Sequence, residues 1–332
     1  MTKNITLAHG NGGEENNELI EGVFYKHLKN DYLKKSEDAS LIEGGRLAFT
    51  TDSFTISPLF FSGGDIGKLS ICGTCNDLAM MGAAPKYVTL AMMIEEGFEM
   101  KTLDKIVRSI KKELEVCGAV VVAGDTKVVP RGSVDKLFIN TSGVGVVELE
   151  GISASNLSVG DAIVVSRDIG AHGAAIYANR EGIDIESTLK SDCASLWPMV
   201  KALKDAGIKP KEMRDATRGG LAAVLNEWAK ASDVCIEVEE ASIPIAQEVK
   251  GICELLGFEP TALANEGTFV LALDPKDVEK TVEVLKTFEQ NEQCTMIGTV
   301  TDEYKQKVTM TSEWDTKRFL DMPTGELLPR IC

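Results

Sequence analysis

The sequence predicts an α/β (α+β) protein with two mixed α/β domains followed by a C-terminal tail. Its 332 residues exceed one ordinary domain, because domains cluster near ~100–150 residues. Both halves alternate amphipathic helix patterns with short apolar strand patterns. Between them, the small and polar residues 151–160 form a turn-rich break. We therefore expect domains at 1–150 and 151–311, and a mobile tail at 312–332 that carries the terminal cysteine.

The first half is expected to begin with a helix over 18–28, whose apolar residues recur at helical spacing. The clearest helix of this half lies at 102–114, because its apolar residues share one face and Thr102 suits an N-cap. The other expected elements are, in chain order, a strand at 46–57, a helix at 64–82, and strands at 87–94, 119–123 and 137–147.

The second half repeats this alternation of strands and helices. Its expected strands lie at 162–166, 234–238, 268–273 and 296–300. Its expected helices lie near 171–179, 196–206, 221–230, 247–256 and 276–288. The periodic pattern ends near Ser312, and the residues beyond it, with Pro323 and Gly325, predict a tail instead of a further element.

The composition is that of a globular chain with an excess of acidic residues. Hydrophobic residues make up 44% and charged residues 26% of the sequence. Thirty-five basic against 51 acidic residues give a net charge of −16, which argues against a surface for nucleic acid or anionic lipid. No apolar run approaches the ~18 residues of a membrane span, and no signal region begins the chain, so we expect a cytoplasmic protein.

The eight cysteines are scattered, mostly within apolar stretches, which predicts buried and reduced thiols instead of a disulfide framework. Cys72-Gly73-Thr74-Cys75 has the spacing of a redox pair or of half a zinc site, but no second CxxC or histidine pair completes such a site. Close packing of small residues on a helix is the favoured interpretation. The other distinctive thiol belongs to Cys332, the last residue of the sequence.

Two glycine-rich loops have the character of phosphate sites, because their backbone N–H groups are uncrowded. They are His9-Gly10-Asn11-Gly12-Gly13, before the first helix, and Ser62-Gly63-Gly64, which leads to Lys68. Neither loop completes a P-loop or a dinucleotide-binding motif. An ordinary turn therefore remains the competing interpretation of each.

Four aspartates lie at the edges of predicted elements: Asp52, Asp77, Asp125 and Asp215. Carboxylates at strand ends beside glycine commonly hold hard cations. Several of them converging on Mg²⁺ would make a nucleoside triphosphate site without a P-loop. Each aspartate taken alone is more simply a helix N-cap or a turn former.

Together these motifs resemble the ATP-dependent superfamily of aminoimidazole ribonucleotide synthetase, selenophosphate synthetase and thiamine-monophosphate kinase. Within it, the chain resembles most closely the HypE family of hydrogenase maturation factors, over essentially its whole length. The resemblance is carried by His9–Gly13, Thr51-Asp52-Ser53-Phe54, Cys75 to Ala83 with Pro85, Ala123 to Val129, Asp215 to Gly220, Asn265-Glu266-Gly267 and Pro329-Arg330-Ile331-Cys332. Asn11 is a minor departure, because many relatives are expected to have serine there.

The resemblance implies two α/β domains of the aminoimidazole ribonucleotide synthetase type, with ATP between them and a homodimer joined through the N-terminal sheets. It implies ATP-dependent dehydration of a carbamoyl group on Cys332 to a thiocyanate, whose cyanide becomes a ligand of the [NiFe]-hydrogenase iron. HypF is the implied carbamoyl donor and the HypC–HypD complex the implied acceptor. The cofactors are ATP and Mg²⁺.

The residues that we assign to the nucleotide and its metal fall in these motifs. The nucleotide contacts are Gly10, Asn11, Gly12, Gly13, Lys68, Asn76, Asp125, Thr126, Asp215, Thr217 and Arg218. The Mg²⁺ ligands are Asp52, Asp77, Asp125 and Asp215.

The catalytic assignments follow from the chemistry of dehydrating an amide. A phosphoryl group turns the amide oxygen into a leaving group, and a base removes the nitrogen protons. Glu266 is the candidate base, because burial in its apolar segment would raise its pKa; a structural glutamate is the alternative. Lys127 suits charge stabilisation better than base catalysis. His9 is expected to contact phosphate or substrate, or to make only a hydrogen bond within its loop.

The tail is expected to carry Cys332 as a tethered substrate. Its twenty or so residues from Ser312 span up to ~70 Å when extended, enough to reach a second protein. The α-carboxylate raises the pKa of the terminal thiol, and Arg330 is expected to oppose that effect and to assist catalysis.

Two other functions remain open on the sequence. One is a kinase or synthetase of the same superfamily, of the selenophosphate or thiamine-phosphate type. Selenophosphate synthetases carry their reactive residue near the N-terminus, whereas no cysteine precedes Cys72 here. The other is a non-catalytic docking scaffold, against which the phosphate loops and the four aspartates argue.

Overall fold

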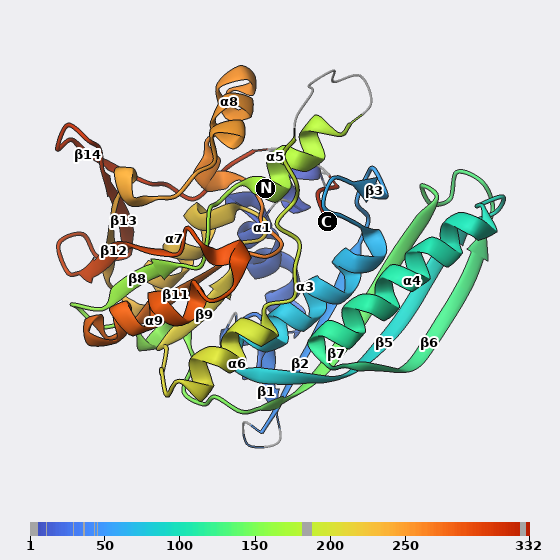
Figure 1. Ribbon diagram of the computed structural model, residues 1–332, viewed down its shortest axis with the longest axis horizontal. Helices are drawn as coiled ribbons and strands as arrows, with labels where there is room; N and C mark the ends of the chain where they lie inside the picture. Colours follow the sequence, from blue (N-terminus) through green and yellow to red (C-terminus); the bar gives the residue numbers. More distant parts are fainter. Residues whose placement is uncertain are drawn as a thin grey trace.

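The computed structural model describes residues 6–10, 12–28, 30–35, 37–42, 44, 46–180, 188–325 and 330–332. Two sheets with covering helices form its framework, one in each half of the chain (Figure 1). The predicted pair of mixed α/β units is therefore confirmed. None of the helices within the described ranges is long and apolar enough to cross a membrane.

A five-stranded sheet forms the centre of the first half. Its strands are β1 (Ser40–Ile42), β2 (Leu47–Phe54), β5 (Ala83–Glu95), β6 (Val120–Val129) and β7 (Leu137–Val147). They lie in the order β1-β2-β7-β5-β6, and every neighbouring pair is antiparallel except β5 and β6. That pair is parallel because α4 (Met100–Cys117) connects its two strands as a crossover helix. A small hairpin, β3 (Phe60–Phe61) and β4 (Gly64–Asp65), precedes the next helix.

Helices α3 (Ile66–Met80) and α4 cover one face of this sheet (Figure 1). Asp65 caps α3, since its carboxylate accepts hydrogen bonds from the N–H groups of Gly67 and Lys68 at 2.8 and 3.2 Å. Almost every residue of α3 is buried, because this helix also contacts elements of the second half. α3 is therefore the central contact between the two halves.

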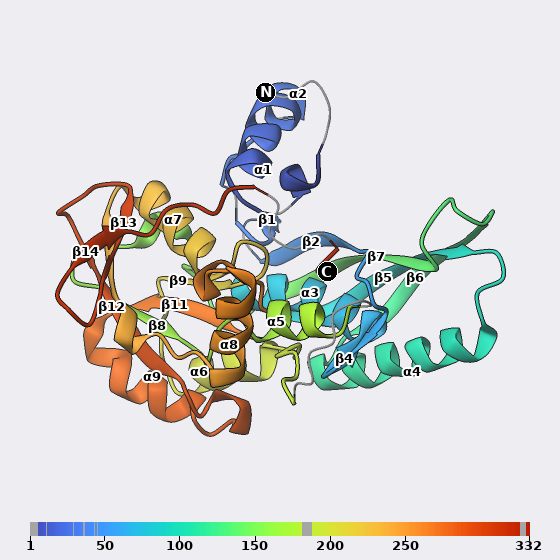
Figure 2. The same ribbon diagram turned by 90° about the horizontal axis from the view of Figure 1, so that it is seen from above.

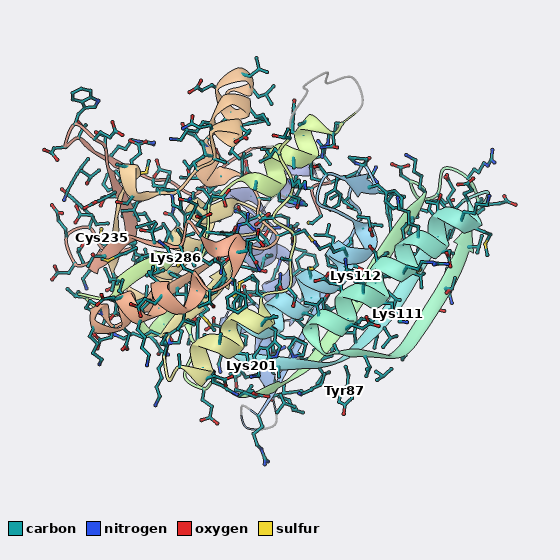
Figure 3. The ribbon with its side chains drawn as sticks, in the orientation of Figure 1. Tyr87, Lys111, Lys112, Lys201, Cys235 and Lys286 are labelled. Carbon is teal, nitrogen blue, oxygen red and sulfur yellow. The ribbon has the colours of Figure 1, made fainter. Side chains whose placement is uncertain are left out.

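The opposite face of the same sheet is open in the single chain. The side chains of Phe49, Tyr87 and Met93 are exposed there, although all three are large and apolar. β6 is exposed along nearly its whole length and lies at the sheet edge. Figure 3 shows Tyr87 at the lower rim of the sheet, with its side chain directed away from the body of the molecule.

A seven-stranded sheet forms the centre of the second half. Its strands are β8 (Ala162–Val165), β9 (Glu212–Asp215), β10 (Cys235–Glu239), β11 (Phe269–Leu273), β12 (Thr295–Thr301), β13 (Lys307–Thr311) and β14 (Lys317–Phe319). They lie in the order β14-β13-β10-β12-β8-β11-β9. Its helices are α5 (Ala171–Ala178), α6 (Trp197–Asp205), α7 (Gly220–Ser232), α8 (Gln247–Leu256) and α9 (Val278–Leu285).

The two faces of this sheet pack into separate cores, because successive strand residues point to opposite sides. Ile163 and Val165 pack with Trp228 of α7 on one face. Val164 between them packs with Met199 of α6 and Leu285 of α9 on the other. All four residues of β8 are buried, as expected for a strand covered on both sides.

The N-terminal glycine loop and the helix after it contact residues 323–325, near the other end of the chain. α1 (Glu14–Leu19), a π-helical segment (Ile20–Tyr25) and α2 (Lys26–Leu28) form one helical region, which stands out from the body in Figure 2. The N–H of Glu14 donates to the carbonyl of Pro323 at 3.1 Å, and the carboxylate of Glu15 accepts from the N–H of Gly325 at 3.1 Å. The predicted helix over 18–28 is thus part of a longer helical region.

The sequence missed the strands β1, β9, β13 and β14 and the β3–β4 hairpin. The residues predicted as tail include β14, which pairs antiparallel with β13. All three residues of β14 are exposed and two are basic, so neither alternation nor an apolar run marks it. The domain limits and the mobility of the tail stay predictions.

Candidate active site

The predicted phosphate-site loop at 9–13 lies in direct contact with the loop that follows β9 and with the segment at Pro323. Gly12 has φ +74°, and a Cβ atom there would lie 2.8 Å from the carbonyl oxygen of Arg218. A Cβ on Gly13 would lie 2.2 Å from the carbonyl oxygen of Pro323. Glycine is therefore required at both positions, because the loop passes between two backbone segments. Gly10 is the last residue of the 3₁₀ turn Leu7–Gly10, which precedes Gly12 and Gly13. Asn11 lies outside the described residues.

Three of the four predicted aspartates form an acidic cluster with one that the sequence did not single out. Asp52 lies on β2, Asp77 on α3 and Asp215 at the end of β9, and all three interact electrostatically with Asp38. Burial raises the pKa of Asp77 well above its usual range, and the carboxylates of Asp52, Asp215 and Asp38 add to that rise. Burial also raises the pKa of Asp52 to about 6, while Arg218 opposes the rise. Negative charge is thus concentrated where β2, α3 and β9 meet.

Asp125, the fourth predicted metal ligand, is not part of this cluster. Its side chain is exposed on β6 and pairs with Lys127 at 2.7 Å, and that hydrogen bond lowers the pKa of Asp125. The strand order and register place Asp125 three strands from Asp52, which is roughly 14 Å. Asp125, Thr126 and Lys127 therefore cannot join the cluster within one copy of the chain.

The acidic cluster consists of carboxylates, the side chains that bind Mg²⁺ in nucleotide sites. In this structure the carboxylates are too far apart to bind one ion together. Within the described ranges, no three His, Cys, Asp or Glu residues lie close enough to hold a metal. The Oδ2 atoms of Asp38 and Asp215 are nevertheless buried without a hydrogen-bond partner among the described residues. A divalent cation would neutralise this charge, so carboxylates of the cluster fit Mg²⁺.

The terminal cysteine lies beside this cluster. One terminal oxygen of Cys332 accepts hydrogen bonds from the N–H and the Oγ1 of Thr55, at 2.9 and 3.3 Å. Burial raises the pKa of the Cys332 thiol to about 12; Arg218 opposes that rise, whereas Glu266 and Asp52 add to it. The thiol therefore interacts electrostatically with Glu266, Arg218 and Asp52. The sequence predicted these as the base, a nucleotide contact and a metal ligand.

Glu266 has the environment expected of the candidate base. It is 2% exposed, and burial raises its pKa well above the usual range of a carboxyl. Asp192 holds its backbone, because the N–H groups of Glu266 and Gly267 donate to the Asp192 carboxylate at 3.1 and 2.9 Å. Thr268 donates to the same carboxylate through its hydroxyl at 2.8 Å. Asp192 thus accepts three hydrogen bonds from the segment that carries Glu266.

Asn76 lies in the domain contact instead of at the nucleotide site. Its carboxamide is buried, donates to the carbonyls of Ala194 and Glu266 at 3.0 and 3.4 Å, and accepts from the N–H of Leu196 at 2.8 Å. These bonds use both ends of the carboxamide on backbone groups. Asn76 thus positions the segments around Glu266, and its contact with a nucleotide stays a prediction.

Arg330 also differs from its predicted role. Its Nε donates to the carbonyl of Thr55 at 2.7 Å, its Nη1 pairs with Asp135 at 2.5 Å, and its guanidinium lies 5.6 Å from the ring centroid of Phe138. Arg218, not Arg330, is the cation that lowers the pKa of the Cys332 thiol. Arg330 therefore anchors the tail.

Two other predicted residues make local contacts. The Nδ1 of His9 accepts from the N–H and the hydroxyl of Thr6, at 3.2 and 2.8 Å, which is the loop hydrogen bond that the sequence left as an alternative. The Nζ of Lys68 donates to the carbonyl of Gly63 at 3.3 Å, within its own glycine loop. Thr217 lies in the loop that follows β9, between Asp215 and Arg218.

The comparisons with known proteins show the family to which the chain belongs. Residues 36–147 match the N-terminal domain of the AIR synthase related family, and residues 158–311 match its C-terminal domain. The chain is 44% identical over 338 residues to carbamoyl dehydratase HypE of Escherichia coli, which covers 99% of both chains. The chain belongs to the HypE family. It is also 40% identical to a putative hydrogenase expression/formation protein of Methanocaldococcus jannaschii, again over 99% of both chains.

Solved structures of HypE proteins have the same fold. HypE in a HypE–HypF complex superposes with a TM-score of 0.88 at 44% identity, over 92% of this chain and 99% of that one. HypE in complex with ATP superposes with a TM-score of 0.83 at 38% identity, over 99% of this chain and 100% of that one. Thiamine monophosphate kinase of Aquifex aeolicus, at 19% identity and a TM-score of 0.68, shares the fold.

Four residues that contact the candidate site escaped the sequence reasoning: Asp38, Thr55, His172 and Asp192. Their partners lie far away along the chain, since Asp192 holds residues 266–268 and Thr55 holds residue 332. No motif spacing encodes such contacts. Asp38 carried a weak signal, because it directly follows Glu37 and precedes a strand.

Proposed function

We propose that the chain dehydrates an S-carbamoyl group on Cys332 to a thiocyanate at the expense of ATP, and so supplies the cyanide ligand of the [NiFe]-hydrogenase iron. One observation carries the proposal: the terminal thiol is buried and interacts electrostatically with Arg218, Glu266 and Asp52. A carbamoyl group on that sulfur would be held beside a buried carboxyl and a cation, which is the arrangement that the reaction needs.

Glu266 and Arg218 have separate tasks in this proposal. ATP supplies the phosphoryl group that turns the amide oxygen into a leaving group. Glu266 removes a nitrogen proton as the carbon–oxygen bond breaks, and its raised pKa makes the resulting carboxylic acid stable in its buried site. Arg218 stabilises the negative charge that develops on the departing oxygen. The amide nitrogen loses its first proton to solvent as its oxygen is phosphorylated and its second to Glu266. The products are an S–C≡N group on the tail, ADP and inorganic phosphate.

The raised pKa of Cys332 has a consequence for the order of steps. At pH 7–8 a docked thiol with a pKa of about 12 is almost entirely protonated, and only the thiolate is nucleophilic. Cys332 therefore accepts the carbamoyl group while the tail is undocked, at HypF, and returns for dehydration. The HypC–HypD complex then takes the cyanide from the tail. The HypE–HypF complex of a relative is consistent with the first of these encounters.

We place Mg²⁺–ATP at the acidic cluster, with Asp52, Asp77 and Asp215 as metal ligands and Asp38 beside them. Asp77→Asn is the cleanest test, because asparagine keeps an oxygen that accepts from the Thr50 hydroxyl, now 2.7 Å from Asp77. We expect Mg²⁺–ATP binding to weaken at least tenfold, or about 1.4 kcal/mol, by calorimetry. Wild-type affinity in this variant and in Asp52→Asn and Asp215→Asn would remove the proposed site.

The same variant is expected to unfold at a higher temperature in the absence of nucleotide. The folded pKa of Asp77 lies above its unfolded value, so its ionisation costs stability as the pH rises. Asparagine has no such cost. The difference in melting temperature should be small in acid, grow as the pH rises to the raised pKa, and then stay constant. Calorimetric melting at several pH values measures this.

We further propose a homodimer joined by the open face of the first sheet, because Phe49, Tyr87 and Met93 expose apolar area there. The phosphate contacts assigned to Asp125, Thr126 and Lys127 then require that β6 of one copy approach the acidic cluster of the other. Phe49→Asp should halve the mass measured by light scattering at micromolar concentration. Trp314→Asp, which changes a more exposed aromatic in the second domain, should leave the mass unchanged. A single-copy mass for the unaltered chain contradicts the dimer.

We place this chemistry in the cytoplasm. All eight cysteines are free and seven are buried, as is usual where thiols are kept reduced.

The proposed function as a whole is tested on the unaltered chain by intact-mass spectrometry. Incubation with HypF and a carbamoyl source should add about 43 Da, the mass of a carbamoyl group on a covalent carrier. ATP with Mg²⁺ should then remove about 18 Da as water. A chain that gains the first mass but keeps it in the presence of Mg²⁺–ATP is not a dehydratase.

A further inference from the structure

A buried histidine holds the docked tail at the carbonyl that precedes the reactive residue. His172 lies in the first turn of α5 and is fully buried. Its Nε2 lies 2.8 Å from the carbonyl oxygen of Ile331, and its Nδ1 lies 2.7 Å from the Oγ of Ser191. The ring of Phe61 packs edge-on against it at 5.5 Å. We propose that His172 is a positioning residue that latches the tail for dehydration.

The hydrogen bonds around the ring determine which nitrogen carries the proton. The Oγ of Ser191 already accepts from the N–H of Cys193 at 3.0 Å, so its own hydrogen is free to point at Nδ1. Nδ1 is then the acceptor, and Nε2 carries the hydrogen that it donates to the Ile331 carbonyl. Burial lowers the pKa of His172, which favours this neutral form. The ring is thereby fixed in orientation at both nitrogens.

The latch and the Thr55 contact restrain the residue that carries the sulfur from both sides. His172 holds the carbonyl before Cys332, and Thr55 holds the terminal oxygen after it. The Ile331 side chain is buried in the same core. With its backbone restrained in this way, Cys332 retains mainly the rotation of its own side chain. This restraint is the positioning that a tethered substrate needs.

One dipeptide connects the latch to the candidate base. Ser191 holds the ring of His172, while the adjacent Asp192 holds the backbone of Glu266 and Gly267. The position of the sulfur relative to Glu266 is therefore set through two consecutive residues. His172 itself contacts the backbone of the tail and not the sulfur, so it acts through Cys332 and is not a catalytic residue. This inference rests on the function proposed above.

The test compares two substitutions in the full-length chain. His172→Leu removes the donor at similar volume, and His172→Gln retains an amide N–H donor. We expect His172→Leu to slow dehydration about tenfold after carbamoylation, because a buried hydrogen bond is lost and a carbonyl is left unpaired. Carbamoylation by HypF should proceed at the wild-type rate, because it occurs on the undocked tail. Iodoacetamide should alkylate Cys332 several-fold faster, since the thiol spends more time in water.

A general loss of stability would not give this pattern. Leu225→Ala, which changes a buried residue of the other core, serves as the matched control and should leave the three rates unchanged. His172→Gln should recover most of the dehydration rate. Ser191→Ala, a smaller change, should slow dehydration in the same direction, which keeps the test open if His172→Leu does not fold.

Each outcome bears on one proposal. Wild-type dehydration in both His172→Leu and Ser191→Ala overturns the latch and leaves the dehydratase standing. Equal slowing of carbamoylation and dehydration also overturns the latch, because the substitution then affects more than the docking of the tail. Absence of dehydration in the unaltered chain overturns the proposed function itself.

Discussion

Cys332→Ala should abolish both mass changes, the gain of about 43 Da with HypF and the later loss of about 18 Da with Mg²⁺–ATP. Sulfur is needed because, as a thiolate, it both accepts the carbamoyl group and leaves as a good leaving group when cyanide departs. The other seven cysteines are buried and do not replace it. The expected loss is complete, within the detection limit of the spectrum.

Binding of the nucleotide provides the check that the variant is intact. Mg²⁺–ATP affinity should be close to that of the unaltered chain, because no metal ligand is removed. Cys253→Ala is the matched control: it removes a buried thiol whose pKa burial raises to about 11, and it should keep both mass changes. If Cys332→Ala still gains the carbamoyl mass, another residue is the carrier.

Glu266→Gln should keep the first mass change and lose the second. Glutamine preserves the shape of the side chain and its backbone hydrogen bonds to Asp192, but it cannot take a proton from nitrogen. Removing a general base typically costs 10²–10⁴-fold in rate, so dehydration should slow by at least about a hundredfold. The measurement is single-turnover mass spectrometry on the pre-carbamoylated chain.

The pH dependence separates loss of the base from loss of structure. Burial raises the pKa of Glu266, and the base is its ionised form, so the wild-type dehydration rate should rise with pH above the usual range of a carboxyl. That rise should be missing in Glu266→Gln. Glu212→Gln changes another buried glutamate of raised pKa and should retain the rise. Dehydration by Glu266→Gln at the wild-type rate would transfer the base assignment, with Lys127 the next candidate.

The sequence was informative where a local pattern determines a local structure. The amphipathic stripe at 102–114 predicted α4, and the apolar strand patterns predicted β5, β7 and β11. The motifs around Asp52, Asp77, Asp215 and Glu266 all converge, because each lies at the end of an element that faces the domain contact. Edge position drew attention to the three aspartates, and the resemblance to a known family then favoured a shared site over ordinary caps and turns.

The sequence alone does not give the distance between residues across a sheet. Asp125 has the same local signature as Asp52, yet strand order separates the two by three strands, and strand order is not a local property. Asn76 lies next to Asp77 on α3, but consecutive helical residues point in different directions, so one faces the acidic cluster and the other the backbone of 194–196. His172 has no motif at all. Its role depends on Ile331, 159 positions away along the chain.

The contact of Gly13 with the Pro323 carbonyl has a consequence for biosynthesis. A ribosome adds ~5–20 residues per second, so roughly 15–60 s pass between the synthesis of these two residues. During that time the N-terminal glycine loop has no partner segment at 323–325, and its helical region lacks the hydrogen bonds at Glu14 and Glu15. The contact between the N-terminal glycine loop and residues 323–325 is therefore formed last, after both halves of the chain have been synthesised.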